Sequence, residues 1–146
     1  MTGKLLAGKT AFISGSGQNI GRAIALRLAA QGCNVIVNGA RNEAACEETA
    51  ARVRAAGAEA QVAMGDVGRA EDVASIVKAA QDRFSGVDIL INNAARRPHK
   101  PFLEMTEDDW HGVIDPALTA AFRLSHALLP GMIERGWGRI VNFAGM

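Results

Sequence analysis

A glycine-rich segment is the part of this chain whose residue types and spacing most directly suggest chemistry. It reads Ser14-Gly15-Ser16-Gly17-Gln18-Asn19-Ile20-Gly21. Gly15 permits a tight turn with positive φ, Gly17 leaves room for a phosphate, and Gly21 allows close packing of a helix on a sheet. The free amides and the positive end of that helix then face an anion. The segment therefore predicts a site for the paired phosphates of a dinucleotide, and the missing Lys-Ser/Thr ending argues against a P-loop ATPase.

Short β-branched runs alternate with longer helical patterns, and this alternation determines where the glycine-rich turn lies. We expect strands at 10–14, 34–38, 58–64, 87–91 and 138–143, and helices at 19–31, 42–57, 73–84 and 106–135. Strands separated by helices of more than ten residues imply right-handed crossovers and a parallel sheet covered on both faces. The sequence therefore predicts a single α/β domain over residues 1–146 with an open doubly wound sheet. Its ligand should lie beyond the carboxyl ends of the strands.

Apolar spacing predicts which faces of these helices are buried. One stripe on the first helix comprises Ile20, Ile24 and Leu28. A second set on the long helix comprises Trp110, Leu118, Phe122, Leu128 and Leu129. We expect these residues to pack on the sheet or, for the long helix, on a partner subunit. Thr106 and Asp109 have the spacing of a capping box at the start of the long helix, and Pro116 should kink it.

Four segments, in chain order, resemble the motifs of the short-chain dehydrogenase/reductase family. The first motif, T-G-x-x-x-G-x-G, maps onto Ser14, Gly15 and Gly21, with Asn19 at the middle glycine; Asn tolerates a left-handed backbone. The others are Asp66-Val67, Asn92-Asn93-Ala94-Ala95, and Gly138-Arg139-Ile140-Val141-Asn142. The resemblance implies a Rossmann-type sheet with strand order 3-2-1-4-5, incomplete at its C-terminal side.

The same resemblance implies an activity and assigns residues to a cofactor. The activity is NAD(P)-dependent hydride transfer between nicotinamide and the carbonyl or alcohol of a small molecule. Residues 15–21 would hold the diphosphate. Asp66 and Val67 would lie by the adenine, with the Asp66 carboxylate accepting from the exocyclic amine. Asn93, Ala94 and Ala95 would lie by the nicotinamide ribose. The family's fourth helix commonly forms a subunit interface, so we expect a homo-oligomer, either a dimer or a tetramer.

The end of the second strand favours NADP over NAD. A carboxylate about 20 residues beyond the glycines usually accepts the ribose 2′-hydroxyl of NAD. Here that position reads Asn38-Gly39-Ala40-Arg41, without a carboxylate. The Arg41 guanidinium suits a 2′-phosphate, which it can bind in bidentate fashion.

The family's catalytic Asn, Ser, Tyr and Lys have no counterpart in this chain, so we assign it no catalytic residue. Ala117 stands at the Asn position and Gly145 at the Ser position. The chain has no tyrosine, and the Tyr and Lys positions would lie beyond Met146. We expect this chain to be the front portion of a longer enzyme and also to derive from a divergent member of the family. The alternative is a catalytically silent nucleotide-binding or scaffold protein on the same fold. A methyltransferase using S-adenosylmethionine is disfavoured by the Asn-Asn-Ala-Ala motif.

Composition disfavours several other classes of protein. Sixteen Lys and Arg against 15 Asp and Glu leave a net charge of +1, which gives no reason to expect nucleic acid or an anionic membrane. No apolar run approaches the ~20 residues of a membrane span. Cys33 and Cys46 are isolated, as in a reducing cytosol, so we expect a cytoplasmic protein without metal. The basic residues of 96–100 read as a solvated loop, or as a contact for an acidic substrate through Arg96 or Arg97.

Overall fold

Five short parallel strands form the centre of the computed structural model, which describes residues 3–144. They are β1 (Thr10–Ile13), β2 (Asn34–Gly39), β3 (Ala60–Met64), β4 (Ile89–Asn92) and β5 (Arg139–Asn142). The sheet order is β3-β2-β1-β4-β5, and every pair is parallel. Ala11 of β1 pairs with Val35 on one side and Ile89 on the other, so β1 lies at the centre. The predicted α/β class and strand order are confirmed.

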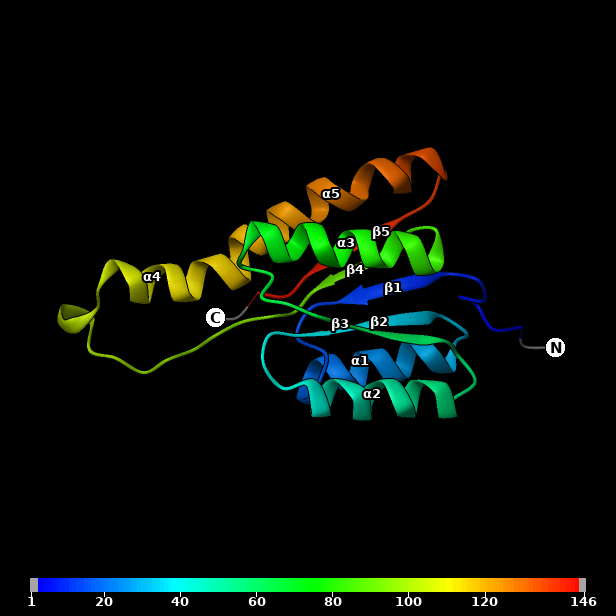
Figure 1. Cartoon of the computed structure of the whole chain (residues 1–146), viewed down its shortest axis with the longest axis horizontal. Coiled ribbons are helices and arrows are strands. Elements are labelled where there is room, and N and C mark those ends of the chain that lie inside the picture. The colour runs from blue at the N-terminus through cyan, green and yellow to red at the C-terminus, as the bar shows by residue number, and fades with distance from the viewer. Residues whose placement is uncertain (1–2, 145–146) are drawn as a thin grey trace.

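Helices cover both faces of this sheet (Figure 1). On one face lie α1 (Asn19–Ala30) and α2 (Glu43–Ala55); on the other lie α3 (Ala70–Phe84) and α5 (Ala120–Glu134). Alternate residues of a strand point to opposite faces, so Ala11 and Ile13 belong to the core under α1 and α2. Phe12 belongs to the second core, under α3 and α5. Strands β1 to β4 thus contribute to two separate hydrophobic cores, as a doubly wound sheet requires, whereas β5 contributes Ile140 to the second core alone.

The predicted long helix is interrupted by one widened turn. A 3-10 turn (Phe102–Glu104) precedes α4 (Glu107–Ile114), and a π-helical turn (Asp115–Thr119) joins α4 to α5. The predicted capping box is present at the start of α4, where Thr106 Oγ1 accepts from the Asp109 amide at 3.2 Å. The predicted disturbance at Pro116 takes the form of the π turn, because a proline has no amide to donate to the preceding turn. Among the described residues, no helix is both long and apolar enough to cross a membrane.

The buried face of α1 differs from the one predicted. Gly21, Ala25 and Ala29 are the buried residues of the helix, whereas Ile24 and Leu28 are only half-buried. Ile20 is 62% exposed. Gly21 lies so close to the glycine-rich turn that a Cβ there would collide with the Gly15 carbonyl oxygen, and the other two buried residues, Ala25 and Ala29, are also small. Larger side chains are therefore displaced to the flanks.

Of the two expectations for the apolar set on the long helix, packing on the sheet holds for one residue only, and packing on a partner subunit stays a prediction for the others. Leu128 is buried, together with Ala120, Leu124 and Met132 of the same helix. By contrast, Trp110, Leu118, Phe122 and Leu129 are exposed. These four buried residues, spaced four apart from 120 to 132, form the side of α5 that packs on the sheet. The remaining apolar side chains therefore lie on a second stripe of the helix. In β5, Val141 is 42% exposed, and Phe143 just after this strand is 53% exposed.

Candidate functional site

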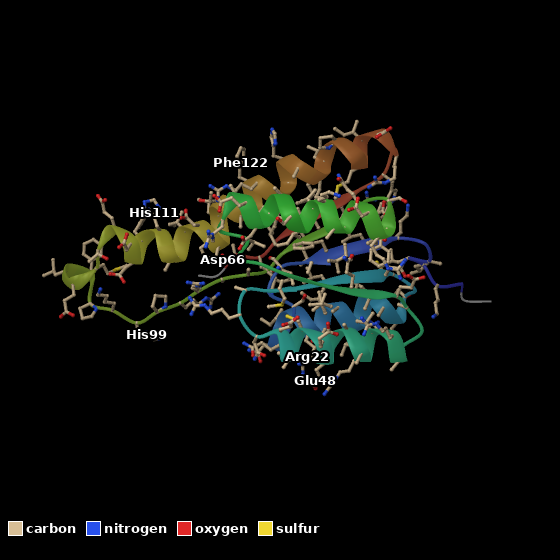
Figure 2. All side chains as sticks on the ribbon, viewed as in Figure 1. Arg22, Glu48, Asp66, His99, His111 and Phe122 are labelled. Carbon is tan, nitrogen blue, oxygen red and sulfur yellow. The ribbon has the colours of Figure 1, made fainter. Side chains whose placement is uncertain are left out.

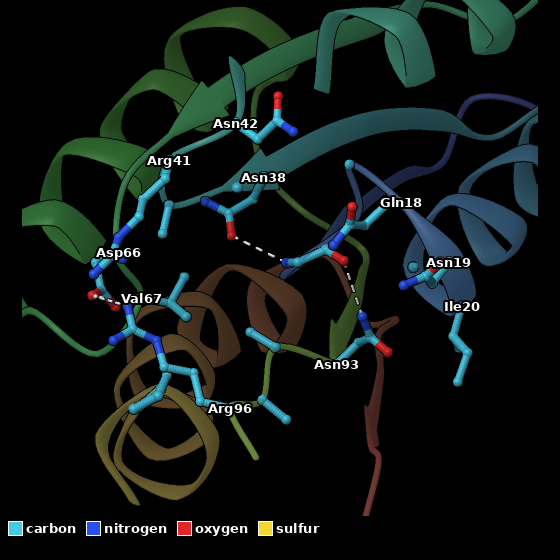
Figure 3. Close-up of a pocket in the computed structure, with 18 of the residues that line it drawn as sticks. Gln18, Asn19, Ile20, Asn38, Arg41, Asn42, Asp66, Val67, Asn93 and Arg96 are labelled. Atoms are coloured by element: carbon cyan, nitrogen blue, oxygen red, sulfur yellow. Dashed lines mark hydrogen bonds and ion pairs between the residues drawn. The ribbon is translucent and has the colours of Figure 1, made fainter. Parts of the chain in front are cut away.

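A cavity of about 850 Å³ lies beyond the carboxyl ends of the central strands (Figure 3). Every residue predicted to bind the cofactor lines this cavity except Ser16: Gly15, Gly17, Gln18, Asn19, Ile20, Gly21, Arg41, Asp66, Val67, Asn93, Ala94 and Ala95. These residues come from four separate loops of the chain, following β1, β2, β3 and β4. The fold therefore brings these residues together at one edge of the sheet, although they are spread over about 80 positions of the sequence.

The glycine-rich turn has the backbone conformation that its residue types predict. Gly15 has φ +65°, and Asn19, in place of the family's middle glycine, has φ +49°. Left-handed backbone is open to glycine and tolerated by asparagine. A Cβ on Gly15 would also lie 3.2 Å from Ala94 Cα. The turn therefore lies directly against the loop that follows β4.

The first amides of α1 are unpaired. Among the described residues, the amides of Gly17 to Gly21 have no hydrogen-bond acceptor. The N-cap residue Gln18 makes no side-chain capping bond, and the first turn carries no acidic residue. Unpaired amides at a helix N-terminus attract an anion, and the helix dipole adds to the attraction. This end of the cavity can therefore hold a phosphate group.

Ser16 has a different position from its neighbours. It is buried, its amide donates to the Asn38 carbonyl at 2.8 Å, and its hydroxyl donates to the Ile13 carbonyl at 2.7 Å. The same hydroxyl accepts from the Asn38 amide at 3.0 Å. Its amide and its hydroxyl thus bind other parts of the protein. Ser16 anchors the turn to β2 and does not face the cavity.

Asn38 is a residue of the site whose role the sequence did not reveal. Its Oδ1 accepts from the Gly15 amide at 3.3 Å, and its Nδ2 donates to the Ala63 and Gly65 carbonyls at 2.9 and 3.1 Å. One buried amide therefore joins the ends of β1, β2 and β3. The sequence offers one signal for this role: Asn38 is a polar residue at the end of an apolar strand. A buried side-chain amide needs hydrogen-bond partners, so such a residue is expected to bind neighbouring backbone groups.

The side of the cavity formed by the loops after β2, β3 and β4 is rich in positive charge. Arg41, Arg96 and Arg97 line it, whereas Asp66 is its one acidic lining residue. Asp66 Oδ2 pairs with the Arg96 guanidinium at 3.3 Å, and its Oδ1 accepts from the Gly68 amide at 2.9 Å. Arg41 extends toward Asp66 in Figure 3. A ligand with more than one phosphate suits this arrangement.

The loop after β4 is tied to the glycine-rich turn through a serine and an asparagine. Ser14 Oγ accepts from the amides of Asn93 and Ala94 at 2.9 and 3.0 Å. The Asn93 side chain donates to the Ser14 and Gly15 carbonyls, both at 3.1 Å. The Asn93 amide group therefore holds the turn, whereas Ala94 and Ala95 present small side chains to the cavity.

The structure describes one of the two residues predicted at the family's Asn and Ser positions. Ala117 lies half-buried in the π turn, next to Pro116, which lines the cavity. Gly145 lies outside the described residues. Cys46 lines the cavity, but burial, followed by the nearby Glu47, raises the pKa of its thiol, so it is not an activated nucleophile. No group of three metal-ligating side chains gathers within residues 3–144.

Comparisons with known proteins agree with this geometry. The chain is 36% identical over 141 residues to a 3-oxoacyl-acyl-carrier-protein reductase of Synechocystis sp., covering 97% of this chain and 57% of the relative. It is 38% identical over 142 residues to a D-beta-hydroxybutyrate dehydrogenase of Cupriavidus necator, covering 96% and 54%. The fold matches a solved metagenomic short-chain oxidoreductase in complex with NADP, with a TM-score of 0.91 and 27% identity, over 97% of this chain and 64% of that one.

The family assignment follows from the extent of the match. The chain spans little more than half the length of these curated relatives. The profile of the short chain dehydrogenase family nevertheless matches residues 9–146, which include every strand, helix and cavity loop described above. This chain belongs to the short-chain dehydrogenase family.

Proposed function

We propose that this chain forms the dinucleotide-binding part of an NAD(P)-dependent oxidoreductase. The reaction is hydride transfer between nicotinamide and the carbonyl or alcohol of a small organic molecule. One observation carries the proposal: the unpaired amides at the start of α1 open into the same cavity as Asp66, Val67 and the loop of 93–95. The names of the two relatives, a 3-oxoacyl reductase and a hydroxybutyrate dehydrogenase, support this class of substrate.

The cavity fits such a cofactor in size and in charge. Its volume of about 850 Å³ is in the range of small-molecule sites. In our proposal the amides of Gly17 to Gly21 bind the diphosphate, Asp66 and Val67 contact the adenine, and Asn93 to Ala95 lie beside the nicotinamide ribose. Ser16 has no direct contact and only supports the turn. The bound nicotinamide supplies the hydride, as in other nicotinamide enzymes.

We further propose NADP as the preferred cofactor. The cavity wall after β2 contains Arg41 and no carboxylate, so a 2′-phosphate would find a cation there and a 2′-hydroxyl would lack its usual acceptor. The solved structure similar to this chain is described in complex with NADP, which supports the same choice.

The test is a titration of the purified chain with NADPH and with NADH, followed by nicotinamide fluorescence. We expect both to bind, with NADPH binding more tightly. A flat response to both cofactors would overturn the proposal.

A catalytically silent nucleotide binder is the second candidate, and Ala117 at the family's Asn position favours it. Alanine has no amide to hold a relay water. Binding of NADPH together with its oxidation over a panel of ketones would support the oxidoreductase. Binding without turnover over that panel would leave the silent binder standing, because the dinucleotide-binding part of an oxidoreductase would give the same result.

We also propose that the exposed stripe on α5 pairs with a second copy of the chain. Leu118, Phe122, Leu129 and Ile133 are all exposed on this helix and the turn before it. Figure 2 shows Phe122 on the outer side of α5, away from the sheet. Exposed apolar stripes of this kind commonly mark an interface between proteins, and the family's use of this helix in dimers supports the same partner.

A further inference from the structure

Two side chains outside the cavity hold the carbonyl of Gly17, in the middle of the glycine-rich turn. Arg22 Nη2 donates to the Gly17 carbonyl oxygen at 2.7 Å. Thr49 Oγ1, on the neighbouring helix α2, lies 3.2 Å from the same oxygen and 3.1 Å from the Ala45 carbonyl. Neither Arg22 nor Thr49 lines the cavity. The turn is therefore attached to α2 from the side opposite to the proposed ligand.

The Arg22 guanidinium is itself held in one orientation. Its Nε donates to Thr49 Oγ1 at 2.9 Å, and its Nη2 pairs with Glu48 at 3.1 Å (Figure 2). A hydrogen bond from Arg52, followed by the charge of Arg22, lowers the pKa of Glu48 below its usual value. Glu48 therefore stays ionised at neutral pH. Thr49 is completely buried, so its hydroxyl, whose one proton lies between the Gly17 and Ala45 carbonyls, has a fixed position.

The geometry of the peptide group links this contact to the cavity. A trans peptide is planar, so its C=O and its N–H point in opposite directions. The Gly17 carbonyl points toward Arg22 and Thr49, and the Gln18 amide of the same peptide points away from them. That amide has no acceptor among the described residues, and both Gly17 and Gln18 line the cavity. A glycine peptide rotates easily, so without these donors the amide would not keep one direction.

We propose that Arg22 and Thr49 are positioning residues for the diphosphate of the cofactor. They hold the Gly17–Gln18 peptide with its amide directed into the cavity before the ligand arrives. A group that is ordered in advance loses less entropy on binding. The inference rests on the proposed function, because it needs a phosphate ligand at the start of α1.

This arrangement predicts a specific pattern of affinities. NADPH and NADH share the diphosphate, so loss of the Arg22 contact should weaken both by the same factor. Adenosine 2′-monophosphate has no diphosphate, so its affinity should not change. A general loss of structure would instead weaken all three ligands.

The test compares Arg22→Met with the wild-type chain, using fluorescence titration for the nicotinamides and calorimetry for adenosine 2′-monophosphate. We expect the Kd for NADPH and for NADH to rise about tenfold, the effect of one charge-assisted hydrogen bond. Arg27→Met is the matched control, since it removes the same charge from an exposed position of the same helix and should leave all three Kd values unchanged.

The Thr49 variants test the second contact to Gly17 and keep the Arg22 side chain in place, although Thr49→Val also removes the acceptor of Arg22 Nε. Thr49→Val keeps the shape and removes the hydroxyl, so it should raise both nicotinamide Kd values about threefold; Thr49→Ser should restore them. If the wild-type chain binds and Arg22→Met stays within twofold for NADPH, the positioning role is wrong although the proposed function stands. If Arg22→Met does not fold, an unchanged Kd in Thr49→Val has the same meaning. If the wild-type chain binds neither nicotinamide, the proposed function itself fails.

Discussion

Arg41 is the residue on which the proposed cofactor preference depends. It is exposed, lines the cavity just after β2, and has no carboxylate beside it in that loop. Replacing it by alanine removes the cation proposed for the 2′-phosphate, and NADH has no such group. Arg41→Ala should therefore raise the Kd for NADPH about tenfold and leave that for NADH within twofold. Parallel fluorescence titrations measure both constants.

A charge reversal extends the test of Arg41. Arg41→Glu supplies an acceptor for a ribose 2′-hydroxyl and repels a 2′-phosphate, so it should shift the preference toward NADH. Arg69→Glu is the matched control, because Arg69 is exposed, lies outside the cavity and pairs only with Glu71 among the described residues. Tighter binding of NADH than NADPH by the wild-type chain would refute the role given to Arg41.

Asn38 is the residue whose replacement should most destabilise the backbone of the site. Its buried side chain bonds the Gly15 amide and the Ala63 and Gly65 carbonyls. Asn38→Ala leaves these groups without partners, so we expect the free energy of unfolding to fall by about 2–3 kcal/mol. Urea denaturation measures this change. Asn34→Ala, at the other end of β2, removes one exposed bond to the Glu59 amide and should cost clearly less. Equal losses in the two variants would contradict the role assigned to Asn38.

At the scale of elements, the start of α4 contains a carboxylate whose ionisation is coupled to folding. Bonds from Lys100 and then from Thr106 lower the pKa of Asp109 from 3.8 to about 2. Because the pKa is lower in the folded chain, the ionised form stabilises α4 above about pH 4. This contribution is lost as the pH falls through about 2.

Asp109→Asn tests this coupling. The variant lacks the titrating group, so its Tm should fall less than that of the wild type between pH 4 and pH 2. Thermal denaturation followed by circular dichroism at each pH measures the difference. Asp108→Asn is the control, because the Asp108 side chain makes no hydrogen bond within residues 3–144. If Asp109→Asn and the wild type lose the same Tm over this range, the capping carboxylate is not coupled to folding.

At the scale of the molecule, the exposed stripe on α5 determines whether the chain is expected to associate. Phe122 is 68% exposed and Leu118 is 67% exposed, so neither contributes much to the stability of a single copy. Phe122→Glu places a charge in the proposed interface and should convert a dimer to a monomer, with a fall in Tm no larger than the loss of the partner accounts for. Sedimentation velocity measures the oligomeric state of the wild type and of the variant.

A second variant separates the interface from the effect of added charge. Ala74 lies on the exposed side of α3, and Ala74→Glu introduces the same charge there. This variant should sediment as the wild type does. A wild-type chain that remains monomeric at high concentration would rule out the proposed pairing.

Local features of the fold could be predicted because they depend on residues close together in the chain. The left-handed backbone at Asn19, the capping box at Thr106 and the disturbance at Pro116 each depend on one or two residues and their neighbours. The strand order came from the resemblance, and the structure confirms it. The cavity loops were predictable for the same reason, since parallel strands place their carboxyl ends at one edge.

Only the tertiary structure could decide which side chains these loops direct into the cavity and which they direct into the protein. Ser16 lies in the predicted turn, yet its polar groups bind β1 and β2. Arg22 and Thr49 are 27 residues apart, and no local pattern shows that both reach the Gly17 carbonyl. Likewise, periodicity shows that Phe122 lies on an apolar stripe but not which neighbour covers it. Spacing along a chain determines the shape of each element, whereas burial and hydrogen bonding between distant segments depend on how the elements pack together.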